Sequence, residues 1–331
     1  MINIITSVCI DVDEYGKEVV YPNLNERIDA NKRREIYWRC AMTFFLTSLR
    51  FNQDKNHILV TNDIDSIIIN GLDLKNKLIK LGVKIIEQPF GKFDPKNYSK
   101  IFRNAFYKFE VINIMSELQN PSILLDVDCI WTKRDEDLFE VLMCGNNLLL
   151  QDTYQNSLRP DKKNHDLNMK DMSELYKTIP INSFKSEHAI RYGGELIGGS
   201  SEQLKIIANK LLLTIDYCKE QYDLGNEIQF NNGFSIFSGM EFISSYIYNS
   251  LPDVNIYDTF GKFSKRLWTN IQPNNVKEKD IELTIWHLPA EKDSGLKELF
   301  NEIIQDSSLF WEMNYGFEFF LGKYVGIPKR N

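Results

Sequence analysis

Cysteine and histidine are scarce in this chain, and their spacing argues against a thiolate metal site. The 331 residues include five cysteines, an odd number, and four histidines. No Cys-x-x-Cys pair and no cluster of cysteine with histidine occurs, as a structural zinc site would need. We expect the five thiols to be buried and reduced, as is usual in a cytoplasmic protein.

A surplus of basic charge is also missing. Lysine and arginine number 39 against 46 aspartates and glutamates, which leaves a formal net charge of −7. Binding to the phosphate backbone of nucleic acids needs a basic stripe, so we expect no nucleic-acid partner. A local basic pocket for a diphosphate is compatible with this acidic total.

Long apolar runs and targeting signals are missing as well. No run approaches the ~20 apolar residues that span a bilayer, and the initial Met-Ile-Asn-Ile-Ile has neither a basic stretch nor a cleavage site. No repeat or low-complexity linker interrupts the chain, and its apolar content of 43% is that of a globular protein. We therefore expect a cytoplasmic protein with one compact domain and a C-terminal elaboration.

Strand and helix patterns alternate through the first part of the chain. Short β-branched and apolar runs that end in turn residues predict strands, and apolar residues at helical spacing predict amphipathic helices. The expected strands cover 2–10, 57–60, 83–87 and 122–125, and the expected helices cover 31–50, 72–81 and 98–118. This alternation predicts an α/β fold with a parallel sheet and helices on both of its faces.

The second part of the chain is less regular. Residues 152–177 are polar and charged, which is typical of a long loop or of surface helices that contact substrates. A glycine-flanked strand, two helices and a final strand are expected at 193–199, 201–220, 240–251 and 281–286.

We divide the chain into a catalytic domain, 1–306, and a C-terminal helix or tail, 307–331. Residues 1–131 form the expected nucleotide-binding half of the domain, and residues 132–306 form the acceptor- and sugar-binding half. The tail is rich in aromatic residues and ends in Lys-Arg-Asn. Such a segment can rest on a membrane surface, which would make the protein membrane-associated, but we favour a helix that packs on the core.

Two aspartates follow the fourth expected strand, in Ile-Leu-Leu-Asp126-Val-Asp128. In an extended chain their side chains project to the same side, and the carboxyl end of a parallel strand is where open α/β sheets bind ligands. Two carboxylates this close repel each other unless a cation lies between them. The pair therefore predicts a Mn²⁺ or Mg²⁺ site that neutralises a diphosphate leaving group.

This segment resembles the metal-binding Asp-x-Asp strand of glycosyltransferases of the GT-A fold. The preceding helix, 107–115, is similar to the helix before that strand in glycosyltransferase family 8, where a basic residue faces the donor. Here Arg103 or Lys108 would hold that place. The resemblance implies a Rossmann-type mixed sheet flanked by helices, a nucleotide-sugar donor such as a UDP-sugar, and a divalent metal on Asp126 and Asp128.

A glycine-rich segment, Arg-Tyr-Gly-Gly-Glu-Leu-Ile-Gly-Gly-Ser at 191–200, resembles the Tyr-Gly-Gly-x-x-x-Gly-Gly-Ser/Thr segment of glycosyltransferase family 6. That segment lines the donor-sugar pocket, which would place Tyr192, Gly193 and Gly194 beside the sugar. Glu195 departs from the pattern, since a small or apolar residue is usual there. It would accept hydrogen bonds from sugar hydroxyls, and the alternative is a surface glutamate in a glycine-rich turn.

Glu241 lies in Phe-Ser-Gly-Met-Glu241-Phe, about forty residues further on. It matches the acidic residue of a helix start in family 6 that lies beneath the anomeric carbon, although the Asp before it and the His after it are missing. A carboxylate there would stabilise oxocarbenium-like charge or act as a nucleophile in a retaining reaction. The alternative is an ordinary acid at a helix N-terminus.

His287 ends the last expected strand, in Ile-Trp-His287-Leu-Pro-Ala-Glu-Lys292. An imidazole can complete an octahedral site with two carboxylates, and a nearby lysine can reach a phosphate. Family 8 has a His-x-x-Gly-x-x-Lys-Pro-Trp segment for these roles. His287 matches its histidine, whereas Lys292 stands one residue early and the Gly and Pro-Trp are missing. The alternative is a core histidine.

Together with these residues, the resemblance to glycosyltransferase families 8 and 6 implies a metal-dependent, retaining glycosyltransferase that moves a sugar from a UDP-sugar to a saccharide or other hydroxyl acceptor, as in polysaccharide biosynthesis. Thr6 and Asp11 would contact the nucleotide. One alternative is a phosphotransferase of the haloacid-dehalogenase type that uses Asp11 and Asp13, although Tyr15 replaces the usual Thr or Val. Another is a sugar-binding protein without catalytic activity.

Overall fold

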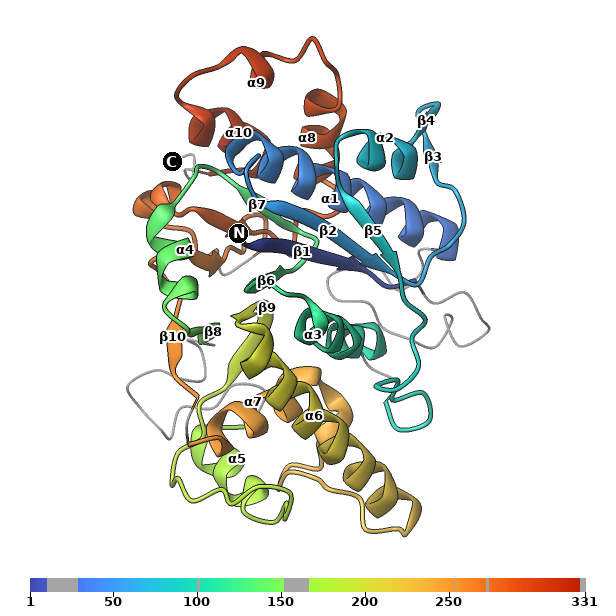
Figure 1. Ribbon diagram of the computed structural model, residues 1–331, viewed down its shortest axis with the longest axis vertical. Coiled ribbons are helices and arrows are strands. Elements are labelled where there is room, and N and C mark those ends of the chain that lie inside the picture. The colour runs from blue at the N-terminus through green and yellow to red at the C-terminus, as the bar shows by residue number, and fades with distance from the viewer. Residues whose placement is uncertain (11–28, 100–101, 152–166, 253, 272–273, 328–331) are drawn as a thin grey trace.

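The computed structural model describes residues 1–10, 29–99, 102–151, 167–252, 254–271 and 274–327. A seven-stranded sheet with the order β10-β8-β9-β6-β1-β2-β5 runs through its centre (Figure 1). Its strands are β1 (Asn3–Val8), β2 (Asn56–Thr61), β5 (Lys84–Glu87), β6 (Ser122–Leu125), β8 (Asn147–Gln151), β9 (Tyr192–Gly199) and β10 (Ile256–Asp258).

The sheet is mixed. β6, β1, β2 and β5 are parallel to one another, and β10 is parallel to β8, whereas β9 runs antiparallel to both of its neighbours, β6 and β8. The expected mixed α/β fold is therefore confirmed, and the parallel arrangement inferred from the alternating first part holds for that part alone. The strand β9 breaks it because it lies between β6 and β8 and runs antiparallel to both.

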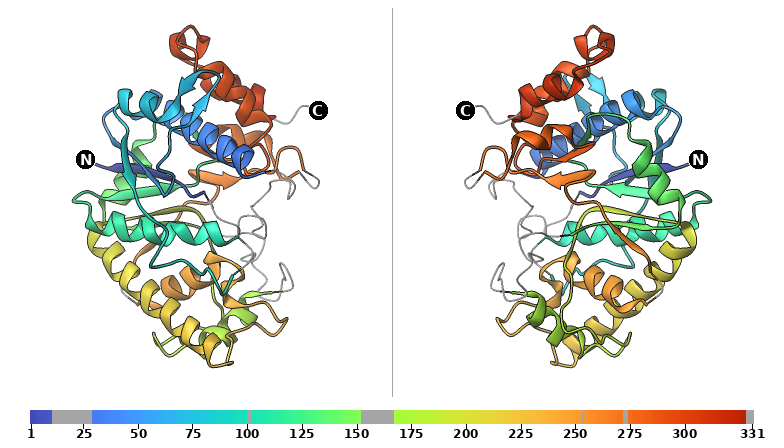
Figure 2. Two further views of the ribbon diagram at one scale, coloured as in Figure 1. Left: turned by 90° about the vertical axis from the view of Figure 1, so that its right-hand side faces the viewer. Right: turned by 90° about the vertical axis from the view of Figure 1, so that its left-hand side faces the viewer.

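Helices cover both faces of the sheet (Figures 1 and 2). On one face lie α1 (Ala30–Phe51), α2 (Leu74–Lys80) and α8 (Gly295–Ile303), and on the other lie α3 (Tyr107–Glu117), α6 (Ser201–Asp223) and α7 (Met240–Ser250). A hydrophobic core lies on each face of the sheet, and successive residues of β1 point into them alternately. Ile4 belongs to one core and Ile5 to the other, and both are fully buried. This follows from the two-residue period of a strand covered on both sides.

A smaller three-stranded sheet determines where the last expected strand lies. It has the order β11 (Ser264–Arg266), β12 (Ile285–His287) and β7 (Cys129–Trp131). β12 pairs antiparallel with β7, so that His287 is opposite Cys129, and parallel with β11, so that His287 is opposite Arg266. The sheet therefore joins the segment after the aspartate pair to a strand more than 150 residues away in sequence.

Several expected elements have different limits in the structure. The helix expected at 98–118 is a 3-10 turn, η2 (Arg103–Phe106), followed by α3, because Phe102 has the left-handed φ of 55° that a helix cannot include. The strand expected at 281–286 is only β12, since a 3-10 turn, η4 (Glu278–Glu282), precedes it. The region 152–177 contains α5 (Met169–Tyr176), and its residues 152–166 lie outside the described part of the chain.

Short elements escaped the sequence patterns altogether. They are β3 (Ile68–Ile69), β4 (Leu72–Asp73), β7, α4 (Glu136–Met143), β8, η3 (Ile236–Ser238), β10 and β11. Elements of two to eight residues carry too few periodic positions to be distinguished from loops. The expectation for the thiols is corrected at Cys144, which is exposed, whereas the other four cysteines are buried.

The C-terminal segment packs on the core, as we favoured. After α8 it forms α9 (Leu309–Glu312) and α10 (Phe317–Val325). Phe310 is fully buried, and the ring of Phe317 meets that of Phe51 at a centroid distance of 5.0 Å. The membrane contact finds no support here, and no helix among the described residues is long and apolar enough to cross a bilayer. The domain boundary at 306 stays a prediction.

Candidate active site

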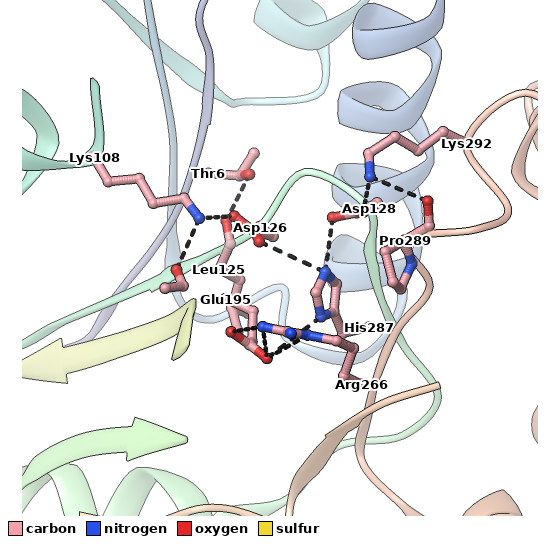
Figure 3. A network of polar contacts seen from close by, with 11 residues as sticks. Thr6, Lys108, Leu125, Asp126, Asp128, Glu195, Arg266, His287, Pro289 and Lys292 are labelled. Carbon is pink, nitrogen blue, oxygen red and sulfur yellow. Dashed lines mark hydrogen bonds and ion pairs between the residues drawn. The ribbon is translucent and has the colours of Figure 1, made fainter. Parts of the chain in front are cut away.

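The two aspartates lie in the turn that joins β6 to β7. The amide of Cys129 donates to the carbonyl of Asp126 at 3.0 Å, and the amide of Asp126 donates to the carbonyl of Glu195 on β9 at 3.0 Å. The extended geometry expected from the sequence is therefore wrong between Asp126 and Asp128, because the chain turns there to enter the smaller sheet. The turn nevertheless brings both carboxylates to one side, as expected (Figure 3).

His287 completes a cluster with this pair. Its Nε2 lies 3.3 Å from Asp128 Oδ1 and 3.6 Å from Asp126 Oδ2. One ligand atom from each of the three residues lies within 4.8 Å of the other two. The pairing of β12 with β7 produces this proximity, since it places His287 opposite the residue that follows Asp128. His287 is also buried at the end of its strand, so its role as a metal ligand stays a prediction.

Each carboxylate of the pair also contacts a lysine (Figure 3). Lys108 of α3 forms an ion pair with Asp126 Oδ1 and donates to the carbonyl of Gly194 at 2.9 Å. Lys292 Nζ lies 2.5 Å from Asp128 Oδ2 and 3.2 Å from the carbonyl of Pro289. The two ammonium groups therefore flank the cluster from opposite sides, where they are suited to bind phosphate oxygens.

At the cluster, interactions with neighbouring charges shift the pKa values more than burial does. Burial alone would raise the pKa of Asp128, but Lys292 and His287 hold that pKa well below its usual range. Burial lowers the pKa of His287, but the carboxylates of Asp128 and Glu195 outweigh it and raise the pKa to about 9. Burial likewise lowers the pKa of Lys108, and Asp126 outweighs it, so that the pKa lies above its usual range.

The donor set fits a divalent cation. Two carboxylates suit the hard ions Mn²⁺ and Mg²⁺, and an imidazole nitrogen suits transition metals, so the combination favours Mn²⁺. His287 Nδ1 is a buried atom without a hydrogen-bond partner in the described part of the chain, whereas the ion pair with Lys292 occupies Asp128 Oδ2. A cation would have to displace the proton of His287, so its binding should tighten as the pH rises.

Glu195 lies behind the cluster and is not on the surface. The side chain is buried, with its carboxylate paired to the Arg266 guanidinium at 2.9 and 3.0 Å and lying 3.8 Å from His287 Nδ1. These charges hold the pKa of Glu195 well below its usual range despite burial, which raises it. The alternative of a surface glutamate is therefore wrong, because β9 is a central strand whose side chains are covered on both faces.

The two glycines before Glu195 make room for charged groups. A Cβ at Gly193 would lie 2.0 Å from Glu195 Oε2, and a Cβ at Gly194 would lie 2.7 Å from Met240 Sδ and 3.2 Å from Lys108 Nζ. Tyr192 is buried in the same strand. None of Tyr192, Gly193, Gly194 or Glu195 lines the cavity described below.

A cavity of about 510 Å³ opens over the cluster. Asp126, Asp128, His287, Lys108 and Lys292 lie in its wall. Glu241 also lines it, at the first turn of α7, where Gly239 leaves space for the carboxylate because a Cβ there would lie 2.9 Å from Glu241 Oε2. The remaining lining residues are Ser7, Cys9, Tyr37, Phe102, Asn104, Ala105, Val127, Leu167, Arg191, Phe234, Ser238, Gly239, Phe242, Arg266, Trp268 and Pro289.

Two expected donor residues, Thr6 and Arg103, do not line the cavity. The Thr6 hydroxyl is buried and donates to the carbonyl of Leu125 at 2.8 Å, which ties β1 to β6. The Arg103 guanidinium is paired with Asp94 at 2.6 and 2.7 Å, so Lys108 is the basic residue that faces the aspartates. Asp11, like Asp13, lies outside the described residues.

Some lining residues gave no signal in the sequence. Arg266 comes from the three-residue strand β11, and Arg191 and Trp268 come from segments without regular structure. Tyr37 comes from α1, where an aromatic residue in a helical pattern reads as core. The charge of Arg266 does not by itself indicate a place in the site, because that place depends on the pairing of β11 with β12.

Comparisons with known proteins give fold likeness only. No protein-family model and no curated protein sequence matches the chain. It is similar to the solved structure of mouse xyloside xylosyltransferase 1, with a TM-score of 0.47 and 11% identity over 86% of this chain and 96% of that one. It is also similar to the galactosyltransferase LgtC in complex with donor and acceptor sugar analogues, with a TM-score of 0.49 and 9% identity over 93% and 98%. A third similar structure is the bifunctional glycosyltransferase WbbM, with a TM-score of 0.47 and 10% identity over 94% of this chain and 50% of that one.

Proposed function

We propose that this chain is a metal-dependent glycosyltransferase that takes a sugar from a nucleoside-diphosphate sugar, a UDP-sugar by preference. The observation that carries the proposal is the cluster of Asp126, Asp128 and His287 in the wall of a 510 Å³ cavity, flanked by two lysines. A carboxylate pair with an imidazole suits a divalent cation, and two ammonium groups beside it suit a diphosphate.

Asp126, Asp128 and His287 would hold the cation, with Mn²⁺ favoured over Mg²⁺. When bound, it would supply positive charge where the leaving diphosphate becomes more negative. Lys108 and Lys292 contact the aspartates directly, so they are positioned to bind phosphate oxygens at the same place. This arrangement concentrates stabilising charge on the leaving group, which is where sugar transfer develops negative charge.

Glu241 is the catalytic residue of this proposal. It projects from the first turn of α7 into the cavity that also contains the cluster. A carboxylate facing the anomeric carbon would stabilise its positive charge or attack it, and the second course leads to retention of configuration. The donor sugar would then lie between Glu241 and the cluster, and the acceptor hydroxyl would come from a saccharide or a similar molecule.

The segment 191–200 supports the site from behind in this proposal. Gly194 accepts a hydrogen bond from Lys108 and thereby helps to orient its ammonium group. Glu195 holds Arg266, whose guanidinium reaches the cavity wall. The donor-sugar contacts expected from Tyr192, Gly193 and Glu195 are therefore replaced by contacts from Arg266 and Glu241. No observation on the described residues favours phosphoryl transfer or sugar binding without catalysis.

Isothermal titration of UDP and of UDP-hexoses, with and without Mn²⁺, tests the proposal. Metal-dependent binding that Asp128→Asn abolishes is the expected result. The matched control is Asp306→Asn, because that side chain is 93% exposed at a site remote from the cavity lining. Thermal melting of both variants checks that each is folded.

The result that overturns the donor site is equal binding of UDP with and without Mn²⁺, or no binding at all. Glu241→Gln tests the chemistry separately, because it leaves the metal cluster intact. It is expected to bind UDP and Mn²⁺ as the wild type does and to lose transfer or donor hydrolysis by at least about 100-fold. Full activity of this variant would remove Glu241 from the mechanism.

A further inference from the structure

The helix α6 lies on the outer edge of the molecule (Figure 2), and several of its apolar side chains are exposed. Ile206 and Leu213 are each 52% exposed, and Leu224, at the end of the helix, is 64% exposed. Tyr217, between them, is half-buried. Exposed apolar side chains grouped on one face of a helix indicate an interaction surface, whereas single ones do not.

These four residues form a row with the spacing of a coiled-coil seam. The four apolar residues are separated by seven, four and seven positions, which is the a/d pattern of a heptad repeat. Two charged residues fill the positions between them. The whole row reads Ile206, Lys210, Leu213, Tyr217, Glu220 and Leu224. At 100° per residue the six side chains fall within about 40° of one line along the helix.

A different face of α6 already packs on the core. Leu204, Leu211, Ile215 and Cys218 are buried there, beside α3 and α7. Tyr217 also packs against that core, whereas Ile206, Leu213 and Leu224 are exposed and are not needed for the fold of the single chain. The row is also separate from the cavity, whose lining includes no residue of α6.

Two copies of this row match each other when they run antiparallel and are both centred on residue 215. In two copies of α6 that run antiparallel, residue 206 of one lies at the level of 224 of the other, and 213 lies at the level of 217. Both of these layers are apolar. The remaining layer sets Lys210 opposite Glu220 of the second copy, and the two-fold axis makes this pair occur twice. None of the ion pairs among the described residues involves Lys210 or Glu220.

We propose that this chain forms a two-fold symmetric dimer through antiparallel pairing of α6. Parallel pairing is disfavoured because it would place Lys210 beside Lys210 and Glu220 beside Glu220. A partner of another kind is not required, since the pattern of charges and apolar residues is matched by the chain itself. The row extends over about 27 Å from residue 206 to residue 224.

One exposed charge works against the pair. Asp216 lies next to the two-fold axis on the flank of the seam, so the Asp216 side chains of the two copies face each other. Like charges at this distance weaken association. We therefore expect a reversible dimer with a dissociation constant in the micromolar range, and Asp216→Asn is expected to lower that constant.

Analytical ultracentrifugation of the full chain from about 1 to 100 µM tests the proposal. Lys210→Glu and Glu220→Lys are each expected to raise the dissociation constant at least about tenfold, since each creates two like-charged layers. The double variant Lys210→Glu/Glu220→Lys restores the opposite charges and is expected to return the constant to within about threefold of the wild type.

The control is Lys205→Glu, an exposed position about 100° away from the row on the same helix, which should leave the constant unchanged. Thermal melting shows whether each variant is folded. A wild-type chain that stays monomeric at 100 µM overturns the proposal. So does a double variant that fails to dimerise while folded, or a loss of dimer in Lys205→Glu equal to that in Lys210→Glu.

Discussion

Replacing Glu195 with glutamine removes one negative charge from behind the cluster of Asp126, Asp128 and His287 while it keeps the size of the side chain. The carboxylate pairs with Arg266 at 2.9 and 3.0 Å and lies 3.8 Å from His287 Nδ1. A metal-ligating histidine whose second ring nitrogen faces a carboxylate is held in orientation and made more basic. The substitution therefore tests whether Glu195 prepares His287 for the metal.

The size of the effect follows from these contacts. Opposite unit charges 2.9 Å apart attract by about 6 kcal/mol at an effective dielectric constant of about 20. The side chain of Arg266 is 31% exposed, so water recovers much of this when the partner is lost. We expect the free energy of unfolding to fall by about 2 kcal/mol, below the ~3–5 kcal/mol for a fully buried pair. The affinity for Mn²⁺ should fall about 10- to 100-fold.

Calorimetric titration with Mn²⁺ measures the second effect, and urea unfolding measures the first. Glu187→Gln is the control, because that glutamate is exposed in the segment before β9. Glu195→Asp retains the charge and is expected to recover part of the metal affinity. The reasoning is refuted if Glu195→Gln is folded and binds Mn²⁺ within about twofold of the wild type.

Three further predictions concern separate parts of the molecule. Gly194→Ala places a methyl group 2.7 Å from Met240 Sδ and 3.2 Å from Lys108 Nζ, so both side chains must shift. The variant is expected to weaken UDP binding about tenfold in calorimetry while Mn²⁺ binding is retained. Burial lowers the pKa of His57 to about 4, so this histidine takes up a proton in the unfolded chain at a higher pH than in the folded one. The free energy of unfolding should therefore be highest above pH 6.5 and fall by about 3 kcal/mol between pH 6.5 and pH 4. Urea unfolding of His57→Gln should lack this pH-dependent fall. Phe310→Ala leaves a cavity at a fully buried site and should lower the free energy of unfolding by about 3 to 5 kcal/mol. It should not change how much protein sediments with anionic vesicles. If the wild type binds vesicles and this variant does not, the tail contacts membranes after all.

The sequence by itself determined the main elements of the fold. Apolar runs at 2–10, 57–60 and 122–125 became β1, β2 and β6, and the helical spacing at 31–50 became α1. These elements are long enough, or apolar enough, for their periodicity to exceed chance, and crossovers that contain a helix join parallel strands. The position of the aspartate pair after β6 followed from the same argument.

The tertiary structure alone decided which distant residues meet that pair. His287 reaches Asp128 because β12 pairs with β7 in one register, and a slip by one residue would turn its side chain to the other face. Arg266 reaches Glu195 of the larger sheet because β11 pairs with β12 in the same small sheet, and neither residue has a local pattern that predicts this. Local periodicity records which face of an element is buried, but pairing between strands more than 100 residues apart depends on the packing of the whole core.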